Sequence, residues 1–416
     1  MSSVHSAFGI VIMLAMAWLL SERRQAVPWR LVGGGLLLAA LMAAALLKIP
    51  PLAAALASLN AVVAVIEQAM LAGTGFVFGY LGGGAPPFAV SDAGSNFVLA
   101  FRALPLVLLV AALSALLFHW GILPRVVKGF AWLLQRTLGL GGAVGVSAAA
   151  NVFVGMVEAP LVIGPYLARL SRGELFIVMN CGMATIAGTV LVLYASVLGP
   201  VVPGALGHLL VASFVATPVA IVVAAILVPP QLSDDARVNF ARQDANAVAA
   251  LTRGTLEGLQ LLLAIVALLI VFVALVALVN ALLGLLPDLL GAPLTLERLF
   301  GWLFSPLAWL IGIPWTEAPT AGVLLGKKTV LNEFIAYVEL SRLPPSALSE
   351  RSRLLLTYAL CGFANFGSLG IMLGGLGALL PTERRAELAE LGTKSIFAGL
   401  LATCLTAAMV GVLIGS

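Results

Sequence analysis

The sequence predicts an all-α polytopic membrane protein, and its composition and apolar runs support this fold class. Hydrophobic residues make up 62% of the chain and charged residues 10%, whereas soluble domains average about 45–50% apolar and ~25% charged residues. The mean hydropathy is +1.12, and the sequence has none of the alternating segments of ~10 residues that a membrane β-barrel needs. Its 416 residues have room for about eight spans of ~20 residues each.

We expect eight transmembrane helices, each an apolar run bounded by polar or basic residues. They are predicted at residues 8–20, 31–47, 104–118, 174–198, 206–228, 255–286, 354–380 and 395–414. Further helices that mix polar or basic residues with apolar and aromatic ones are expected to lie along the membrane surface. These interfacial helices are predicted at residues 51–70, 123–138 and 294–311. A glycine- and proline-rich loop is expected at residues 73–95.

Two apolar regions are interrupted by polar residues, glycine and proline, and we expect each to form a re-entrant helical hairpin. The first covers residues 139–170 and contains Asn151, Glu158 and Pro160. The second covers residues 312–340. A broken backbone and a carboxylate are tolerated at membrane depth only where they face protein or a water-filled cavity. The first hairpin is therefore predicted to form half of a substrate site.

Two short motifs recur in order and indicate an internal repeat. Val157-Glu-Ala-Pro160 is echoed by Thr316-Glu-Ala-Pro319, and Cys181-Gly-Met-Ala-Thr185 by Cys361-Gly-Phe-Ala-Asn365. Because the repeats begin an odd number of spans apart, equivalent elements are expected to face opposite sides of the membrane, as in inverted-repeat transporters. The predicted units are residues 1–100 (N-terminal spans on the scaffold side), 101–228 (first repeat), 229–253 (a cytoplasmic loop) and 254–416 (second repeat).

Basic residues concentrate in alternate loops, which predicts the orientation of the chain. The loops around Arg23, Arg125, Arg172, Arg237 and Arg384 are expected in the cytoplasm by the positive-inside rule, so that both termini lie outside. The net charge of +4 belongs to these loops, and we expect no nucleic-acid partner.

The cysteines lie within apolar runs without paired spacing, which indicates packing residues. They are Cys181, Cys361 and Cys404.

Four polar groups within the apolar regions are hard to explain by packing, namely Glu158, Asn332, Glu333 and Asn365. Carboxylates accept hydrogen bonds from hydroxyl groups and carboxamides both donate and accept, which suits a neutral, hydroxyl-rich solute. Main-chain carbonyls at a helix break, with a hydroxyl and an asparagine oxygen, suit a small hard cation. Glu317 is expected at a helix end near the interface, and Lys327 and Lys328 at the interface or the hairpin turn.

Four motifs resemble those of the concentrative nucleoside transporters, in the bacterial eight-span branch. They are Gly155-Met-Val-Glu-Ala-Pro-Leu161, Ala184-Thr-Ile-Ala-Gly188, Leu325-Gly-Lys-Lys-Thr-Val-Leu-Asn-Glu-Phe-Ile-Ala-Tyr337 and Leu360-Cys-Gly-Phe-Ala-Asn-Phe-Gly-Ser368. The last two are the most specific, and the resemblance runs from about residue 101 to the C-terminus. It implies a homotrimer of the bacterial inner membrane that imports nucleosides with a sodium gradient, by elevator-like movement of a hairpin domain.

The resemblance also implies the residues of the site. The nucleobase would contact Met156, Val157, Glu158 and Val190. The ribose would contact Glu333, Asn365 and Ser368, with Phe363 lining the pocket. Sodium would be held by Asn151, Thr185 and the main-chain carbonyls of Val154 and Ile186.

Departures from the family pattern leave alternatives open. Met156 and Val157 stand where the family has a Gln-Thr pair, and Gly367 replaces one of its serines, so the preferred nucleoside, natural or modified, is not determined. Proton coupling through Glu158 or Glu333 is the alternative to sodium. An intramembrane enzyme is a distant alternative, because the sequence has no HExxH motif, paired aspartates or Ser/His pair at membrane depth. No cofactor is expected beyond the coupling ion.

Overall fold

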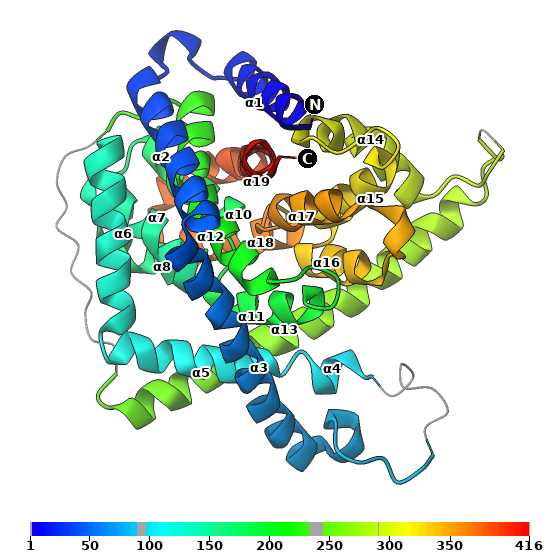
Figure 1. Cartoon of the computed structure of the whole chain (residues 1–416). Coiled ribbons are helices and arrows are strands. Elements are labelled where there is room, and N and C mark those ends of the chain that lie inside the picture. The colour runs from blue at the N-terminus through cyan, green and yellow to red at the C-terminus, as the bar shows by residue number, and fades with distance from the viewer. Residues whose placement is uncertain (1, 90–96, 157, 233–243, 290, 416) are drawn as a thin grey trace.

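A computed structural model describes residues 2–89, 97–156, 158–232, 244–289 and 291–415, and within these ranges the chain is helical with no β-sheet (Figure 1). In the described residues, 7 helical segments are long and apolar enough to cross a membrane. They are Trp29–Lys48, Pro50–Gly82, Leu99–His119, Arg172–Leu198, Ala205–Leu227, Ala247–Leu283 and Thr382–Ile414. The chain is therefore a multi-pass membrane protein.

All of these segments except Pro50–Gly82 coincide with predicted spans. The predicted first span is helix α1 (Ser2–Leu19), which has 18 residues. The predicted fourth span is divided into α10 (Arg172–Ala184) and α11 (Gly188–Leu198), and the seventh into α17 (Glu350–Ala359) and α18 (Phe366–Leu379). Each of these two segments leaves helical geometry where its polar motif lies.

Two predicted loops are shorter than expected. Helix α3 (Pro50–Phe78) continues into the region predicted as loop from residue 73, and the Thr74 hydroxyl donates at 2.8 Å to the carbonyl of Gly82 in the turn that follows. Helix α13 (Ala247–Leu283) begins inside the predicted loop 229–253, where Asn246 accepts from the backbone N–H of Ala249 and caps the helix. Residues 90–96 and 233–243 lie outside the described residues.

The two predicted repeats have the same order of helices. The first comprises α6 (Ile122–Leu138), α7 (Gly142–Val154), α8 (Glu158–Val162), α9 (Gly164–Leu167), α10, α11 and α12 (Ala205–Leu227). The second comprises α14 (Leu296–Ile311), α15 (Ala318–Val330), α16 (Glu333–Arg342), α17, α18 and α19 (Arg385–Ile414). In each set the first helix packs on the second (α6 on α7, α14 on α15), and the broken helix packs on the last one.

The structure corrects the register of this repeat. Glu158 begins α8, the helix that follows the break of the first hairpin. Its counterpart by position is Glu333, which begins α16 after the break of the second hairpin. Glu317 instead precedes α15 and accepts hydrogen bonds from the backbone N–H and hydroxyl of Ser349. The predicted match of the Glu317 motif with the Glu158 motif was therefore wrong, since Glu158 follows the break of its hairpin whereas Glu317 precedes the first helix of the other.

The two broken helices meet at their breaks. A Cβ atom on Gly362 would lie 2.9 Å from the carbonyl oxygens of both Met183 and Ala184. Only glycine allows the backbone of the second break to approach the first this closely. The polar backbone of both breaks is thereby brought to one place in the interior.

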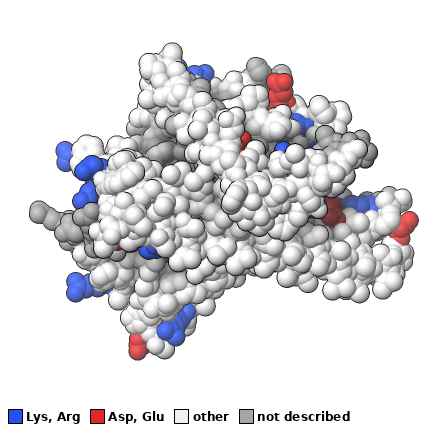
Figure 2. Space-filling view, turned by 90° about the horizontal axis from the view of Figure 1, so that it is seen from below, with Lys and Arg blue, Asp and Glu red and all other residues white. Residues whose placement is uncertain are grey.

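Helices α5 (Leu106–His119) and α13 pack closely against each other. Gly254 and Gly258 of α13 are spaced four residues apart, and Cβ atoms on them would lie 2.6 Å from the Cβ of Ala115 and 3.0 Å from that of Ala111. This small-xxx-small spacing brings the two helix backbones together, as in membrane helix pairs. Most of α13 is exposed and apolar, which suits contact with lipid or another apolar surface. The face drawn in Figure 2 is largely free of charge, and its charged groups lie mainly at the margins.

Both ends of the chain lie on the same side of the protein (Figure 1). The Arg351 guanidinium donates to the Ser6 hydroxyl near the N-terminus and to the Gly411 carbonyl near the C-terminus. Helix α1 packs along α19, and α2 (Trp29–Lys48) packs along α12. The N-terminal helix and the C-terminal helix are thus held next to each other.

Three loops predicted to share the cytoplasmic side are joined by an ionic network. Arg172 Nη2 lies 2.9 Å from Glu22 Oε1 and 2.7 Å from Glu390 Oε1, and Lys394 also contacts Glu22. Hydrogen bonds from Arg172 and then Lys394 outweigh the cost of partial burial and lower the pKa of Glu22 from 4.5 to about 2. The network holds the loop after α1 against the ends of α10 and α19.

Replacing Glu22 with Gln is expected to lower the apparent midpoint of thermal unfolding at pH 7, because the ionic network loses its shared carboxylate. After solvent screening the loss is about 1 kcal/mol, or roughly 2 °C in the midpoint. A depressed pKa stabilises the fold above pH 4.5, and this contribution is lost as the pH falls toward about 2. Unfolding midpoints of the wild type and Glu22→Gln should therefore converge over that interval. A constant difference between the two proteins would contradict the assignment.

Candidate functional site

A cavity lies where the breaks of both hairpins and both broken helices converge, and α13 closes it on one side. Its volume is about 170 Å³, which is room for on the order of ten water molecules. The wall is apolar except for a few groups at the helix breaks. Its predicted members are Val154, Met156, Glu158, Val190, Glu333, Phe363, Asn365 and Ser368.

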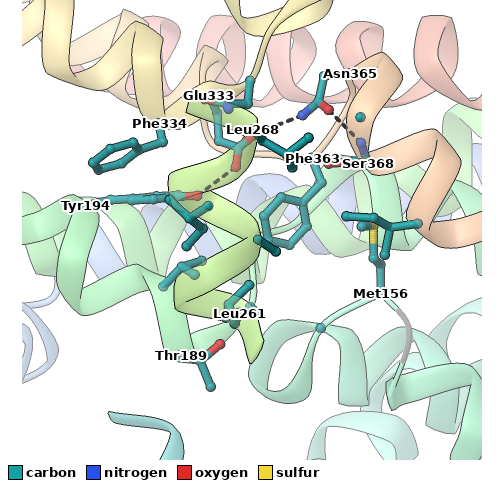
Figure 3. A pocket seen from close by; sticks show the side chains of 18 of the residues that line it. Met156, Thr189, Tyr194, Leu261, Leu268, Glu333, Phe334, Phe363, Asn365 and Ser368 are labelled. Atoms are coloured by element: carbon teal, nitrogen blue, oxygen red, sulfur yellow. Dashed lines mark hydrogen bonds between the residues drawn. The ribbon is translucent and has the colours of Figure 1, made fainter. Parts of the chain in front are cut away.

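Glu333 is the centre of the polar cluster in this cavity (Figure 3). Its Oε1 accepts a hydrogen bond from the Tyr194 hydroxyl at 2.6 Å, and its Oε2 accepts from Asn365 Nδ2 at 2.9 Å. Asn365 Oδ1 accepts in turn from the backbone N–H of Ser368 at 2.7 Å. Glu333 is 4% exposed and Asn365 1% exposed. The carboxylate is thus buried with a donor on each oxygen, and it faces an open cavity.

Two asparagine caps place these groups. Asn332 precedes α16, and its side chain accepts from the backbone N–H of Ile335, which sets Glu333 in the first turn of the helix. The positive end of the helix dipole there favours a carboxylate. Asn365 caps α18 in the same way, which uses its Oδ1 and leaves Nδ2 to donate to Glu333. The same residue therefore starts a helix and fixes the carboxylate.

The first hairpin contributes the opposite wall. Met156 is buried and Glu158 is exposed, and both line the cavity. Gly155 between α7 and α8 has a φ of 103°, a conformation that favours glycine. A second cavity of about 230 Å³ adjoins the first, shares Val154, Glu158, Thr189 and Leu261 with it, and extends to Arg253. Val157 lies outside the described residues.

The predicted cation ligands lie on α7 and at the break between α10 and α11, which pack against α7. Asn151 is 1% exposed in α7, and neither its Oδ1 nor its Nδ2 has a hydrogen-bond partner. Helix α7 packs against α10 and α11, whose break holds Thr185 and Ile186. The end of α7 reaches this break, since a Cβ on Gly155 would lie 3.1 Å from the Cβ of Ala187.

A small hard cation would satisfy the unpartnered Oδ1 of Asn151. The Thr185 hydroxyl donates to the Cys181 carbonyl at 2.9 Å, so its oxygen lone pairs remain to accept or coordinate. The described residues hold no group of three or more His, Cys, Asp or Glu side chains suited to a metal. The available ligands are amide, hydroxyl and carbonyl oxygens, the donor set typical of sodium sites at broken helices.

Several residues that line the cavity were not among those predicted from the sequence. Tyr194 lies one helical turn after Val190 on α11, so a tyrosine at this spacing in an apolar span was the signal that could have revealed it. Thr189 also lines the cavity. The wall from α13 had no sequence signal, because it consists of ordinary apolar residues. Its members are Leu261, Ala264, Ile265, Leu268 and Phe272.

The two lysines before the second hairpin's break differ from each other. Lys327 forms ion pairs with Glu339 at 2.5 Å and Glu297 at 3.2 Å near the surface. Lys328 is fully buried in the last turn of α15, beside the hairpin turn that was one of its two predicted places. Its ammonium group is satisfied by oxygen acceptors on α17 and α19, namely the Ala359 carbonyl and the Thr403 hydroxyl.

Comparison with known sequences shows where this chain belongs. Residues 8–81 match the N-terminal and residues 208–411 the C-terminal family of Na⁺-dependent nucleoside transporters, and residues 100–201 match a nucleoside recognition domain. The nucleoside permease NupC of Helicobacter pylori is 36% identical, covering 100% of this chain and 98% of the permease. The chain belongs to the concentrative nucleoside transporter family. An uncharacterized transporter of Haemophilus influenzae is 39% identical over 100% of this chain and 99% of its own.

Solved structures of this family have the same fold. CNTnw in an inward-facing, substrate-bound state matches with a TM-score of 0.89 and 38% identity, covering 100% of this chain and 98% of that one. Variants of CNTnw in outward-facing and intermediate states match with TM-scores from 0.88 to 0.90. The concentrative nucleoside transporter fold therefore holds along the whole chain, and the resemblance found in the sequence motifs is confirmed.

Proposed function

We propose that this protein imports nucleosides by symport with sodium, through elevator-like movement of the domain that contains both hairpins. The observation that carries the proposal is the buried Glu333 carboxylate, which faces a cavity bounded by both hairpin breaks and accepts hydrogen bonds from Tyr194 and Asn365. Ribose hydroxyls would donate to the remaining lone pairs of this carboxylate. Charge-assisted hydrogen bonds of this kind are about twice as strong as neutral ones.

The two ends of the cavity suit the two parts of a nucleoside. Glu333, Asn365 and Ser368 form the polar end proposed for the ribose. Met156 and Val190 form a more apolar end, with Glu158 as its carboxylate, and this end is proposed for the base. Phe363 presents its ring between them (Figure 3). Val157 is also proposed to lie beside the base, and this proposal rests on the sequence motif alone.

Replacing Met156 with Gln is expected to change the preference among nucleobases. The thioether is a weak acceptor, whereas a carboxamide both donates and accepts, and one such contact changes discrimination by about 1–3 kcal/mol. Competition by unlabelled purine, pyrimidine and modified nucleosides against labelled uptake would measure the profile. The sodium dependence should stay the same and serves as the control. An identical substrate profile would show that Met156 does not face the base.

The coupling ion is proposed to bind between Asn151, Thr185 and the carbonyls of Val154 and Ile186. Support comes from the unpartnered amide of Asn151 and from the packing of α7 against the break in the fourth span. The ion would fix the tip of the first hairpin, and with it Met156 and Glu158. Binding of the ion and of the nucleoside would thereby favour each other.

Uptake into proteoliposomes tests this function. Labelled nucleoside uptake should follow an inward sodium gradient at equal pH on both sides. Uptake that ignores sodium and follows a pH gradient would favour the proton alternative, with Glu158 or Glu333 as the titrating group. Absence of uptake under both gradients, for every nucleoside that binds the purified protein, would remove the symporter proposal.

The placement in the membrane is part of the same proposal. We propose eight transmembrane helices, with α10–α11 and α17–α18 as broken spans, and with residues 139–170 and 312–340 as re-entrant hairpins of an inverted repeat. Helices α3, α6 and α14 would lie along the membrane surface. The protein would form a homotrimer in the bacterial inner membrane with both termini outside. Cross-linking in native membranes and cysteine labelling from each side would test the assembly and the orientation.

A further inference from the structure

Lys328 is a buried lysine in the second hairpin. It lies in the last turn of α15 and has 0% of its surface exposed. Its Nζ donates to the carbonyl oxygen of Ala359 at 2.8 Å and to Oγ1 of Thr403 at 2.8 Å. Within the described ranges it forms no salt bridge, whereas its neighbour Lys327 forms two. The buried ammonium is therefore held by a carbonyl and a hydroxyl, which are oxygen types that also coordinate sodium.

The carbonyl of Ala359 is a favourable partner for any cation. Ala359 is the last residue of α17, immediately before the break that leads to Asn365. The final carbonyls of a helix have no partner within it, and they form the negative end of the helix dipole. A positive charge at this point stabilises the end of α17 and ties it to α15 and α19.

The first repeat places an asparagine at a comparable point of its first hairpin helix. Asn151 lies in the last turn of α7, and its unpartnered amide lies near the place where α10 ends at Ala184. In each repeat, a polar side chain near the end of the first hairpin helix is thus set beside the break of the following helix. The amide oxygen of Asn151 is free to accept an ion, whereas the ammonium of Lys328 already carries a positive charge.

We propose that Lys328 is a tethered cation that fills, in the second repeat, the position that sodium fills in the first. This inference rests on the sodium coupling proposed above. It makes Lys328 a positioning residue, because the segments that it joins lead directly to Glu333 and Asn365. It also fixes the stoichiometry at one sodium ion per nucleoside, since the second hairpin needs no ion from solution.

The variant Lys328→Asn tests the inference by giving the second repeat the side chain of the first. The shorter side chain leaves space beside the Ala359 and Thr403 oxygens and adds a carboxamide oxygen. Uptake should then require two sodium ions, so that the Hill coefficient for sodium rises from about 1 to about 2. Lys327→Asn is the matched control, because it removes the neighbouring lysine and its ion pairs near the surface. Its Hill coefficient should stay near that of the wild type.

Two further measurements keep the test decisive. If Lys328→Asn does not transport, the thermal midpoint of the purified variant should depend on sodium more steeply than that of the wild type, because a second bound ion adds its own stabilisation. The same steepness in both proteins would overturn the inference. Dual-isotope uptake by the wild type should give one sodium per nucleoside, and two would overturn it as well. A wild type that ignores sodium in every assay would instead remove the proposed sodium coupling.

Discussion

Glu333→Gln is expected to abolish nucleoside uptake while the protein still folds and assembles. The substitution preserves shape but removes the charge that Tyr194 and Asn365 stabilise, and it places an amide group where two donors already point. Each charge-assisted hydrogen bond contributes about 1.5–3 kcal/mol. Loss of two of them, with the ribose contact, lowers uptake at low nucleoside concentration roughly 100-fold or more, since ~1.4 kcal/mol is a factor of ten.

Initial rates of labelled nucleoside uptake in proteoliposomes would measure this loss, and size-exclusion chromatography would report assembly. Glu339→Gln is the matched control on the same helix, because Glu339 pairs with Lys327 near the surface rather than facing the cavity. It should retain uptake close to that of the wild type. Normal uptake by Glu333→Gln would remove Glu333 from the substrate site.

Thr185→Val is expected to raise the sodium concentration for half-maximal uptake by roughly 5–30-fold, which corresponds to one or two kcal/mol. Valine has nearly the shape of threonine but offers no oxygen to the cation proposed beside Asn151. The backbone N–H of Thr185 still donates to the Cys181 carbonyl in the variant. The substitution therefore removes the hydroxyl ligand while the break between α10 and α11 keeps its backbone hydrogen bond. Sodium titrations of uptake at a fixed nucleoside concentration would measure the shift.

The control for Thr185→Val is Thr217→Val. Thr217 is also fully buried, and its hydroxyl donates to the Ser213 carbonyl four residues earlier at 3.0 Å, as Thr185 donates to Cys181. Both substitutions delete the same kind of local hydrogen bond, but only one is beside the proposed ion. Equal sodium dependence in the two variants would argue against the assignment of Thr185.

The site was largely predictable where a polar group interrupts an apolar run. Glu158, Glu333 and Asn365 were identified because carboxylates and carboxamides are costly in lipid unless they face a cavity, and the structure places all three on one cavity. Tyr194 was missed, because an isolated tyrosine in a span is also explained by packing. Its role depends on the approach of α11 to α16, which are far apart in the sequence.

The repeat shows a different limit. Two ordered motifs predicted an internal repeat, and the helices follow a similar order in both halves. The register of this repeat could not be predicted, because Gly, Ala and Pro recur throughout the chain and a four-residue match carries little information. The helix boundaries pair Glu158 with Glu333 rather than with Glu317.

By itself, the sequence determined the membrane class, the family and most polar groups of the cavity, because composition, apolar run length and short motifs are local properties. Only the tertiary structure decided how these groups act on one another. The break between α10 and α11 meets the break between α17 and α18 through the close approach at Gly362, and this contact brings the two hairpins to one cavity. Likewise, burial of Lys328 against α17 and α19 depends on packing between segments that no local pattern connects.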